Sequence, residues 1–140
     1  MKTAASFWSI LFLFTLMSCK SVTSTTDNMK LVEGTWVGQL DADSLVLTFI
    51  EGEFEGSPTL SGSAFIPSRT TPSTYIIMNG SRDRQDKIYF ALYKYPVVAK
   101  EEFHLQGTVA YGEIKGTFTR FDESGGISKT GNWSAKTWYQ

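Results

Sequence analysis

Residues 102–121, which read EFHLQGTVAYGEIKGTFTRF, decide the fold. Around Phe103 and Leu105, apolar and polar residues alternate, and this period of two is typical of a half-buried β-strand. Tyr111-Gly112 then interrupts the pattern as a tight turn before a second strand-like stretch begins. The stretch therefore predicts an antiparallel hairpin with strands at Glu102–Ala110 and Glu113–Phe121.

Short β-strands are also expected on both sides of this hairpin. Turn signals recur about every 10–15 residues, and no window has a convincing helical period. Boundaries are expected at the Gly- and Glu-rich connection 52–58, at the turn dipeptide Asn79-Gly80 and at Pro96. The remaining strands are predicted at residues 35–40, 44–51, 60–66, 74–78, 88–93 and 128–138.

Eight strands joined by short connections favour an antiparallel meander that closes into an up-and-down β-barrel. Recurrent glycines support closure, because Gly weakens a strand interior and is kept there for bends or close backbone approach. An open β-sandwich in which these glycines are ordinary bulges is the alternative. The glycines share a frame in which Thr, Ser or Asn follows at once: Gly34, Gly62, Gly107, Gly116 and Gly131.

The segment Gly34-Thr35-Trp36 resembles the Gly-x-Trp signature that begins the first strand of lipocalins and related calycin barrels. The resemblance implies that Trp36 closes the base of the barrel and packs against a basic residue. Lys136 on the last strand is expected in that place, with Arg120 as the other candidate. It further implies a cup that holds a small hydrophobic ligand.

The N-terminus carries a targeting signal. Residues 7–16 form an apolar run of about ten residues after Lys2, too short for a membrane span that needs roughly 20. Leu16-Met17-Ser18-Cys19 follows and resembles the lipobox of bacterial lipoproteins. In those proteins the chain is cut before the cysteine, which then carries the lipid. An ordinary secretory signal that leaves a free Cys19 is the alternative.

This resemblance divides the chain into three parts: a signal peptide at 1–18, a lipidated Cys19 with a flexible Ser/Thr-rich tether at 19–29, and the barrel at 30–140. The lipid on Cys19 implies attachment to a membrane of the bacterial envelope. Lys20 in place of Asp favours the outer membrane, and the lack of an acidic cluster after Cys19 favours its periplasmic face.

Charge and composition exclude several kinds of function. The chain has 13 Lys and Arg against 14 Asp and Glu, with the signs interspersed, so no basic patch indicates a nucleic-acid partner. Because the only cysteine is Cys19, the barrel at 30–140 contains no cysteine and one histidine, which excludes disulfides within it, Cys nucleophiles and His-rich zinc sites. We therefore expect no cofactor, no metal and no enzymatic activity.

Two groups of residues are candidates for catalysis or cation binding, and a structural role is expected for both. His104 lies between inward-facing Phe103 and Leu105, so it is expected to point to solvent. Glu51, Glu53 and Glu55 alternate along the chain, which suits a shared acid face or a cation site. They flank Gly52 and Gly56 in a connection, however, which predicts a solvated charged loop instead.

Two strands are apolar on both faces, which exceeds what one packed face requires. We therefore expect an interaction surface that includes Tyr75, Tyr89 and Tyr93. Two functions follow: a barrel that holds a small hydrophobic ligand, or a barrel with a packed core that binds an envelope protein through its outer surface.

Overall fold

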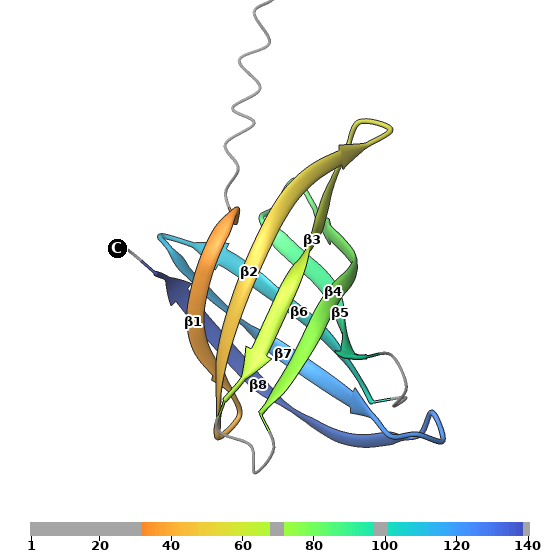
Figure 1. Cartoon of the computed structure of the whole chain (residues 1–140). Coiled ribbons are helices and arrows are strands. Elements are labelled where there is room, and N and C mark those ends of the chain that lie inside the picture. The colour runs from red at the N-terminus through yellow and green to blue at the C-terminus, as the bar shows by residue number, and fades with distance from the viewer. Residues whose placement is uncertain (1–31, 68–71, 97–100, 139–140) are drawn as a thin grey trace, which may run out of the picture.

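The computed structural model describes residues 32–67, 72–96 and 101–138, which form eight β-strands (Figure 1). The predicted signal peptide, Cys19 and the tether lie outside the described residues and stay predictions. No helix among the described residues is long and apolar enough to cross a membrane. The strands are β1 (Gly34–Leu40), β2 (Asp43–Phe54), β3 (Ser57–Ile66), β4 (Ser73–Arg82), β5 (Lys87–Tyr95), β6 (Glu102–Ala110), β7 (Glu113–Phe121) and β8 (Ile127–Thr137).

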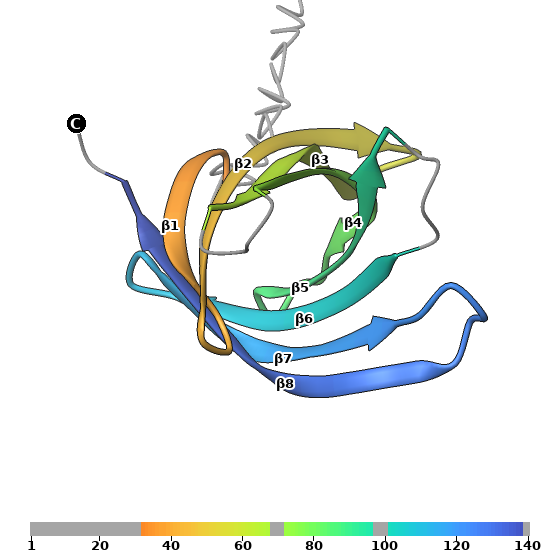
Figure 2. The same ribbon diagram turned by 60° about the horizontal axis from the view of Figure 1, so that its bottom comes forward.

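The strands close into a barrel. Each strand pairs with the next in antiparallel fashion, and β8 returns to pair with β1 from Trp36 opposite Thr137 to Leu40 opposite Trp133. Figure 2 shows the strands surrounding one interior. The predicted eight-stranded up-and-down barrel is confirmed, and the open sandwich is wrong because β1 and β8 leave no free edge.

The hairpin predicted from residues 102–121 is confirmed at both strand bounds. Tyr111 and Gly112 have φ values of 51° and 75°, the left-handed values that a two-residue hairpin turn favours. A two-residue turn also fixes the register of the strands that it joins. Gln106 consequently lies opposite Thr117, and His104 opposite Thr119.

The hairpin of β2 and β3 is longer than predicted, because most of the expected connection at 52–58 is paired. Gly52 lies opposite Thr59 and Phe54 opposite Ser57, and Figure 1 shows this hairpin extending beyond the neighbouring strands. Glu51 is therefore not in a solvated loop, as predicted, but inside β2 on the inward side of its pleat. Its side chain is 6% exposed and its Oε1 lies 3.1 Å from Nε of Arg82.

Asn79-Gly80 does not end β4, contrary to prediction. The strand continues to Arg82, and its register with β5 shifts between Met78 and Ser81. Asn79 has a φ of 53°, a left-handed conformation that suits a β-bulge as well as a turn. The bulge leaves Asn79 exposed on the outer wall of the barrel.

Apolar side chains from every strand point into the middle of the barrel, and each of these buried residues is no more than 5% exposed. Phe90 on β5 forms edge-on ring contacts with Phe49 on β2, 5.1 Å between centroids, and with Trp133 on β8, 5.5 Å. Neither β2 nor β8 is a sheet neighbour of β5, so these contacts cross the barrel. Aromatic pairs in this geometry add stabilisation beyond the area that they bury.

Two of the predicted glycines stand where strands approach closely. A Cβ on Gly116 would lie 1.8 Å from the backbone oxygen of Gln106, and one on Gly62 would lie 1.9 Å from that of Thr48. Gly62 also has a φ of 136°, which side-chain-bearing residues rarely adopt. Glycine at these positions therefore permits the strong coiling of a narrow barrel.

Candidate functional site

The described interior does not form the ligand cup that the lipocalin resemblance implies. A hollow large enough for a ligand would leave the side chains around it accessible, yet the inward side chains are almost fully buried. The ring contacts of Phe90 with Phe49 and Trp133 occupy the middle of the barrel. The described part of the interior is thus close-packed in the middle of the barrel, and a hydrophobic ligand held there stays an untested expectation.

Trp36 is fully buried near the start of β1, as expected of a residue that closes a barrel. Its indole Nε1 donates a hydrogen bond to the backbone oxygen of Val32, 2.8 Å away. Gly34 between them has a φ of 120°, which lets the chain before β1 fold back over the indole. The pairing of Trp36 with this segment needs no ligand.

The prediction that Trp36 packs against a basic residue is wrong for both candidates, Lys136 and Arg120. Lys136 pairs with Val37 and therefore points to the opposite side of the sheet from Trp36; its Nζ lies 4.0 Å from Oε1 of Glu113. Arg120 lies at the far end of β7, where its Nη2 is 3.1 Å from Oε1 of Glu101. The indole of Trp36 instead has the backbone oxygen of Val32 as its hydrogen-bond partner.

Of the three tyrosines predicted at an interaction surface, Tyr75 is wrong. Tyr75 is fully buried and packs edge-on against Phe103. Tyr89 and Tyr93 point outward from β5, and Tyr89 is 41% exposed. The prediction that they share a face opposite Ile88, Phe90 and Leu92 is confirmed.

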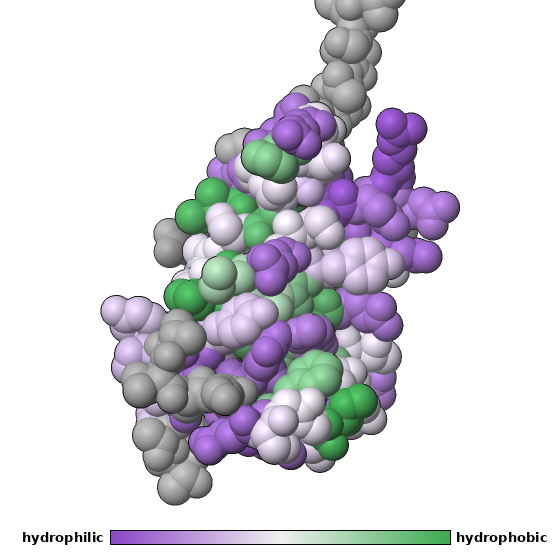
Figure 3. Space-filling view, turned by 90° about the vertical axis from the view of Figure 1, so that its right-hand side faces the viewer, coloured by the Kyte–Doolittle hydropathy of each residue, from purple (hydrophilic) through white to green (hydrophobic). Residues whose placement is uncertain are grey.

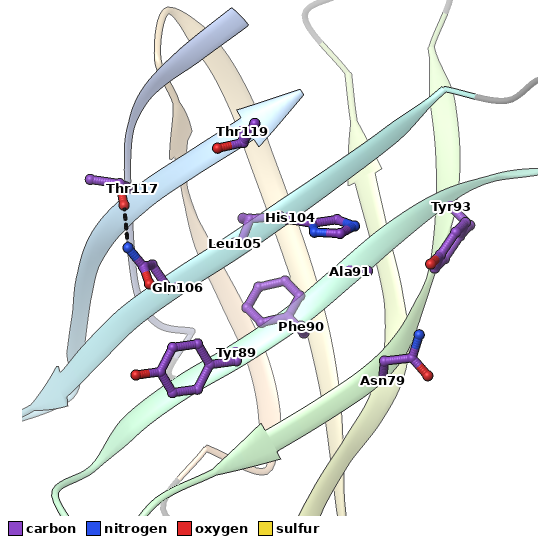
Figure 4. A pocket seen from close by; sticks show the side chains of 10 residues that line it. All are labelled: Asn79, Tyr89, Phe90, Ala91, Tyr93, His104, Leu105, Gln106, Thr117 and Thr119. Atoms are coloured by element: carbon purple, nitrogen blue, oxygen red, sulfur yellow. Dashed lines mark hydrogen bonds between the residues drawn. The ribbon is translucent and has the colours of Figure 1, made fainter. Parts of the chain in front are cut away.

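A groove of about 390 Å³ lies on the outer wall, across β4 to β7 (Figure 4). Ala91 forms its floor, since this small outward residue is 5% exposed and stands between Tyr89 and Tyr93 on the same strand. His104 lies opposite Ala91 on β6. The residues that line the groove are Asn79, Tyr89, Phe90, Ala91, Tyr93, His104, Leu105, Gln106, Thr117 and Thr119.

The polar side chains of the groove are amides, hydroxyls and one imidazole. Nε2 of Gln106 donates to Oγ1 of Thr117 at 3.0 Å, and this contact holds the amide in place (Figure 4). No described residue that lines the groove is Lys, Arg, Asp or Glu. The groove is therefore suited to hydrogen bonding with a neutral molecule.

A small network borders the groove at Glu102. The carboxylate of Glu102 contacts Nε2 of His104, whose ring lies 4.8 Å from that of Phe121. A hydrogen bond from Tyr93 to Glu102 raises the pKa of Tyr93 above its ordinary value, and burial and the negative charge of Glu102 add to this. A contact with Asn79 acts in the opposite direction. These contacts fix the side chains at one end of the groove.

Glu102→Gln is expected to lower the pKa of Tyr93 towards 10, because the substitution removes the negative charge beside the phenol. The folded state favours protonated Tyr93. Its contribution to stability is thus complete below about pH 10 and is lost as the pH rises through the folded-state pKa. NMR titration of the tyrosine Cζ signals, assigned with Tyr93→Phe, measures the shift. Glu113→Gln is the control, since Glu113 pairs with Lys115 at 3.0 Å; an equal shift in both variants would contradict the contact.

Chemically, the groove suits binding better than catalysis. His104 and Glu102 form an acid–base pair, but the imidazole is 55% exposed and its neighbour across the strands is Thr119, a weak nucleophile without activation. Among the described residues, no three His, Cys, Asp or Glu side chains come together to hold a metal ion.

Sequence reasoning found Tyr89 and Tyr93 but missed the residues on the neighbouring strands. One signal was available: a two-residue turn at Tyr111-Gly112 sets Gln106 opposite Thr117. No local signal places Asn79 in the groove, because its position depends on the bulge in β4.

Comparison with known proteins identifies no relative: no family model, no curated protein and no solved structure matches the chain significantly. Function must therefore be inferred from the geometry of the chain itself.

Proposed function

We propose that this chain is a lipid-anchored binding module of the bacterial envelope, with its binding site on the outer wall of the barrel. Lipidation at Cys19 supplies the attachment, and the packed barrel supplies a rigid scaffold. The groove between Tyr89 and Tyr93 receives another component of the envelope. The proposal keeps the packed core and the outer binding surface of the second function expected from the sequence, which names an envelope protein as the partner, and extends the partner to other envelope components. We prefer it to the cup that holds a hydrophobic ligand.

One observation carries the proposal: the interior is occupied by crossing aromatic contacts, while an open groove lies on the outer wall. Rigid strands position the groove residues, and sites built on strands are held more accurately than sites on loops. Partly exposed tyrosines suit binding, because they offer a large contact area at a small entropic cost.

The double variant Tyr89→Ser/Tyr93→Ser is expected to weaken capture of envelope fragments by the purified chain about 30-fold or more. Truncating aromatic residues at the centre of an interface costs about 2 kcal/mol or more, which corresponds to this factor. Capture is measured by biolayer interferometry on envelope vesicles from the source bacterium.

Tyr111→Ser is the matched control, since Tyr111 is fully exposed on the turn between β6 and β7, outside the groove. It is expected to bind like the wild type. Equal binding by all three proteins, with unchanged circular dichroism, would rule out the groove as the site.

A further inference from the structure

The groove is polar, and its described lining contains no carboxylate, ammonium or guanidinium group. No described lining residue is an acid, a lysine or an arginine. Glu102, at its border, is already engaged by Tyr93 and His104. An ionic ligand would lose its hydration without gaining an opposite charge, which is unfavourable. The lining therefore selects a neutral ligand.

The hydrogen-bonding groups of the lining are mostly of the kind that both donate and accept. The carboxamides of Asn79 and Gln106 offer an oxygen and an NH₂ side by side, and the hydroxyls of Thr117 and Thr119 do both at one atom. The hydrogen bond to Thr117 uses one N–H of the Gln106 amide and fixes the orientation of the amide group. Its second N–H and its oxygen remain to bind a ligand. Such groups match a ligand whose own hydroxyls also donate and accept.

Two aromatic rings stand on either side of Ala91, next to these polar groups. Tyr89 and Tyr93 are four residues apart on one strand, which separates their Cα atoms by roughly 13 Å. Ala91 lies between them and has the smallest side chain among the lining residues (Figure 4). A ring with C–H groups on its faces and hydroxyls around its edge would contact tyrosine and amide together.

We propose that the groove binds a neutral carbohydrate of the envelope, with a sugar ring over Ala91 between Tyr89 and Tyr93 and its hydroxyls on Gln106 and Asn79. The inference rests on the proposed function and names the ligand class of the same site. The volume of about 390 Å³ lies in the lower part of the range for ligand pockets, about 300–1,000 Å³.

A protein partner is favoured less by the same observations. A stable protein interface needs about 800 Å² on each side around a core depleted of charge. On the face that Figure 3 shows, hydrophobic residues form separate spots among polar ones. The groove itself is small and evenly supplied with polar groups.

The direct test is calorimetric titration of the full lipidated chain, in a detergent without a sugar headgroup, with neutral di- to tetrasaccharides of glucose, galactose, mannose and N-acetylglucosamine. At least one is expected to bind with a Kd of about 1 mM or tighter. Tyr89→Ala and Gln106→Ala are each expected to weaken binding about tenfold or more. The controls Tyr111→Ala and Gln85→Ala, which change exposed residues outside the groove, are expected to bind like the wild type.

A second test separates this inference from the proposed function. Envelope vesicles are treated either with periodate, which cleaves the vicinal diols of sugars, or with protease, and capture by the full chain is measured again. Loss of groove-dependent capture after periodate alone supports the carbohydrate. Loss after protease alone overturns it in favour of a protein and leaves the proposed function standing. If the double variant Tyr89→Ser/Tyr93→Ser captures the vesicles as well as the wild type does, both the carbohydrate inference and the proposed function are wrong.

Discussion

Phe90→Ala is expected to lower the free energy of unfolding by about 3–5 kcal/mol, the range for removing a buried aromatic side chain. Phe90 is 3% exposed and contacts rings from two non-neighbouring strands, Phe49 and Trp133, so no single strand can move to fill the gap. This is a large part of the roughly 5–15 kcal/mol typical of a folded domain. Urea denaturation followed by tryptophan fluorescence measures the loss.

Phe65→Ala is the matched control, because Phe65 points outward from β3 and is 39% exposed. Its expected cost is below about 1 kcal/mol, as for most surface substitutions. A similar small cost for Phe90→Ala would mean that the barrel is not filled at this level, and the cup for a hydrophobic ligand would return as the better function.

Cys19→Ser is expected to move the protein from the membrane fraction almost completely to the soluble fraction. A serine hydroxyl cannot form the thioether that carries the lipid, and each buried methylene contributes about 0.8 kcal/mol to anchoring. Cell fractionation and intact-mass spectrometry measure the loss of attachment and of the lipid mass. The binding groove is expected to be unaffected, which separates anchoring from recognition.

Ser18→Ala is the control for this variant, since it keeps a small residue before the cysteine. It is expected to remain with the membrane. If the wild type carried no lipid and fractionated as a soluble protein, the ordinary secretory signal would be the correct interpretation of residues 1–18. If Cys19→Ser remained with the membrane, attachment would not depend on a lipid at Cys19.

The strands and hairpins of the barrel could be predicted because their sequence signals are local. The hairpin of β6 and β7 follows from alternation around a two-residue turn, and the observed bounds agree with it. The hairpin of β2 and β3 is longer than predicted, because Gly52 and the glutamates around it are residues typical of an exposed loop. Glu51 is instead held inside by Arg82, which is distant in sequence and gives no local signal.

Tyr75 was wrongly expected on the surface because β4 is apolar on both faces. In β4, Tyr75 and Ile77 face the core while Ile76 and Met78 face outward, and all four are apolar or aromatic. A pattern of period two identifies the buried face only when the other face is polar. On β5 both faces of the strand were predicted correctly, because Ile88, Phe90 and Leu92 are clearly more apolar than Tyr89 and Tyr93 on the opposite face.

The candidate site was predicted only in part for a related reason. Tyr89 and Tyr93 could be found because they share a face of one strand. The groove, however, is formed where β4 to β7 lie together, and its floor exists because Ala91 is small. The partner of Trp36 was also misplaced, since a backbone oxygen such as that of Val32 leaves no trace in the pattern of side chains.

The pairing of β1 with β8 also determines when folding can finish. Trp36 meets Thr137, so the final contacts join the two ends of the domain, and such distant contacts form slowly. Until β8 has been synthesised and has docked, the sheet stays open, and β1 and β7 keep exposed backbone groups that favour aggregation or proteolysis. Closure of the barrel thus depends on its last strand.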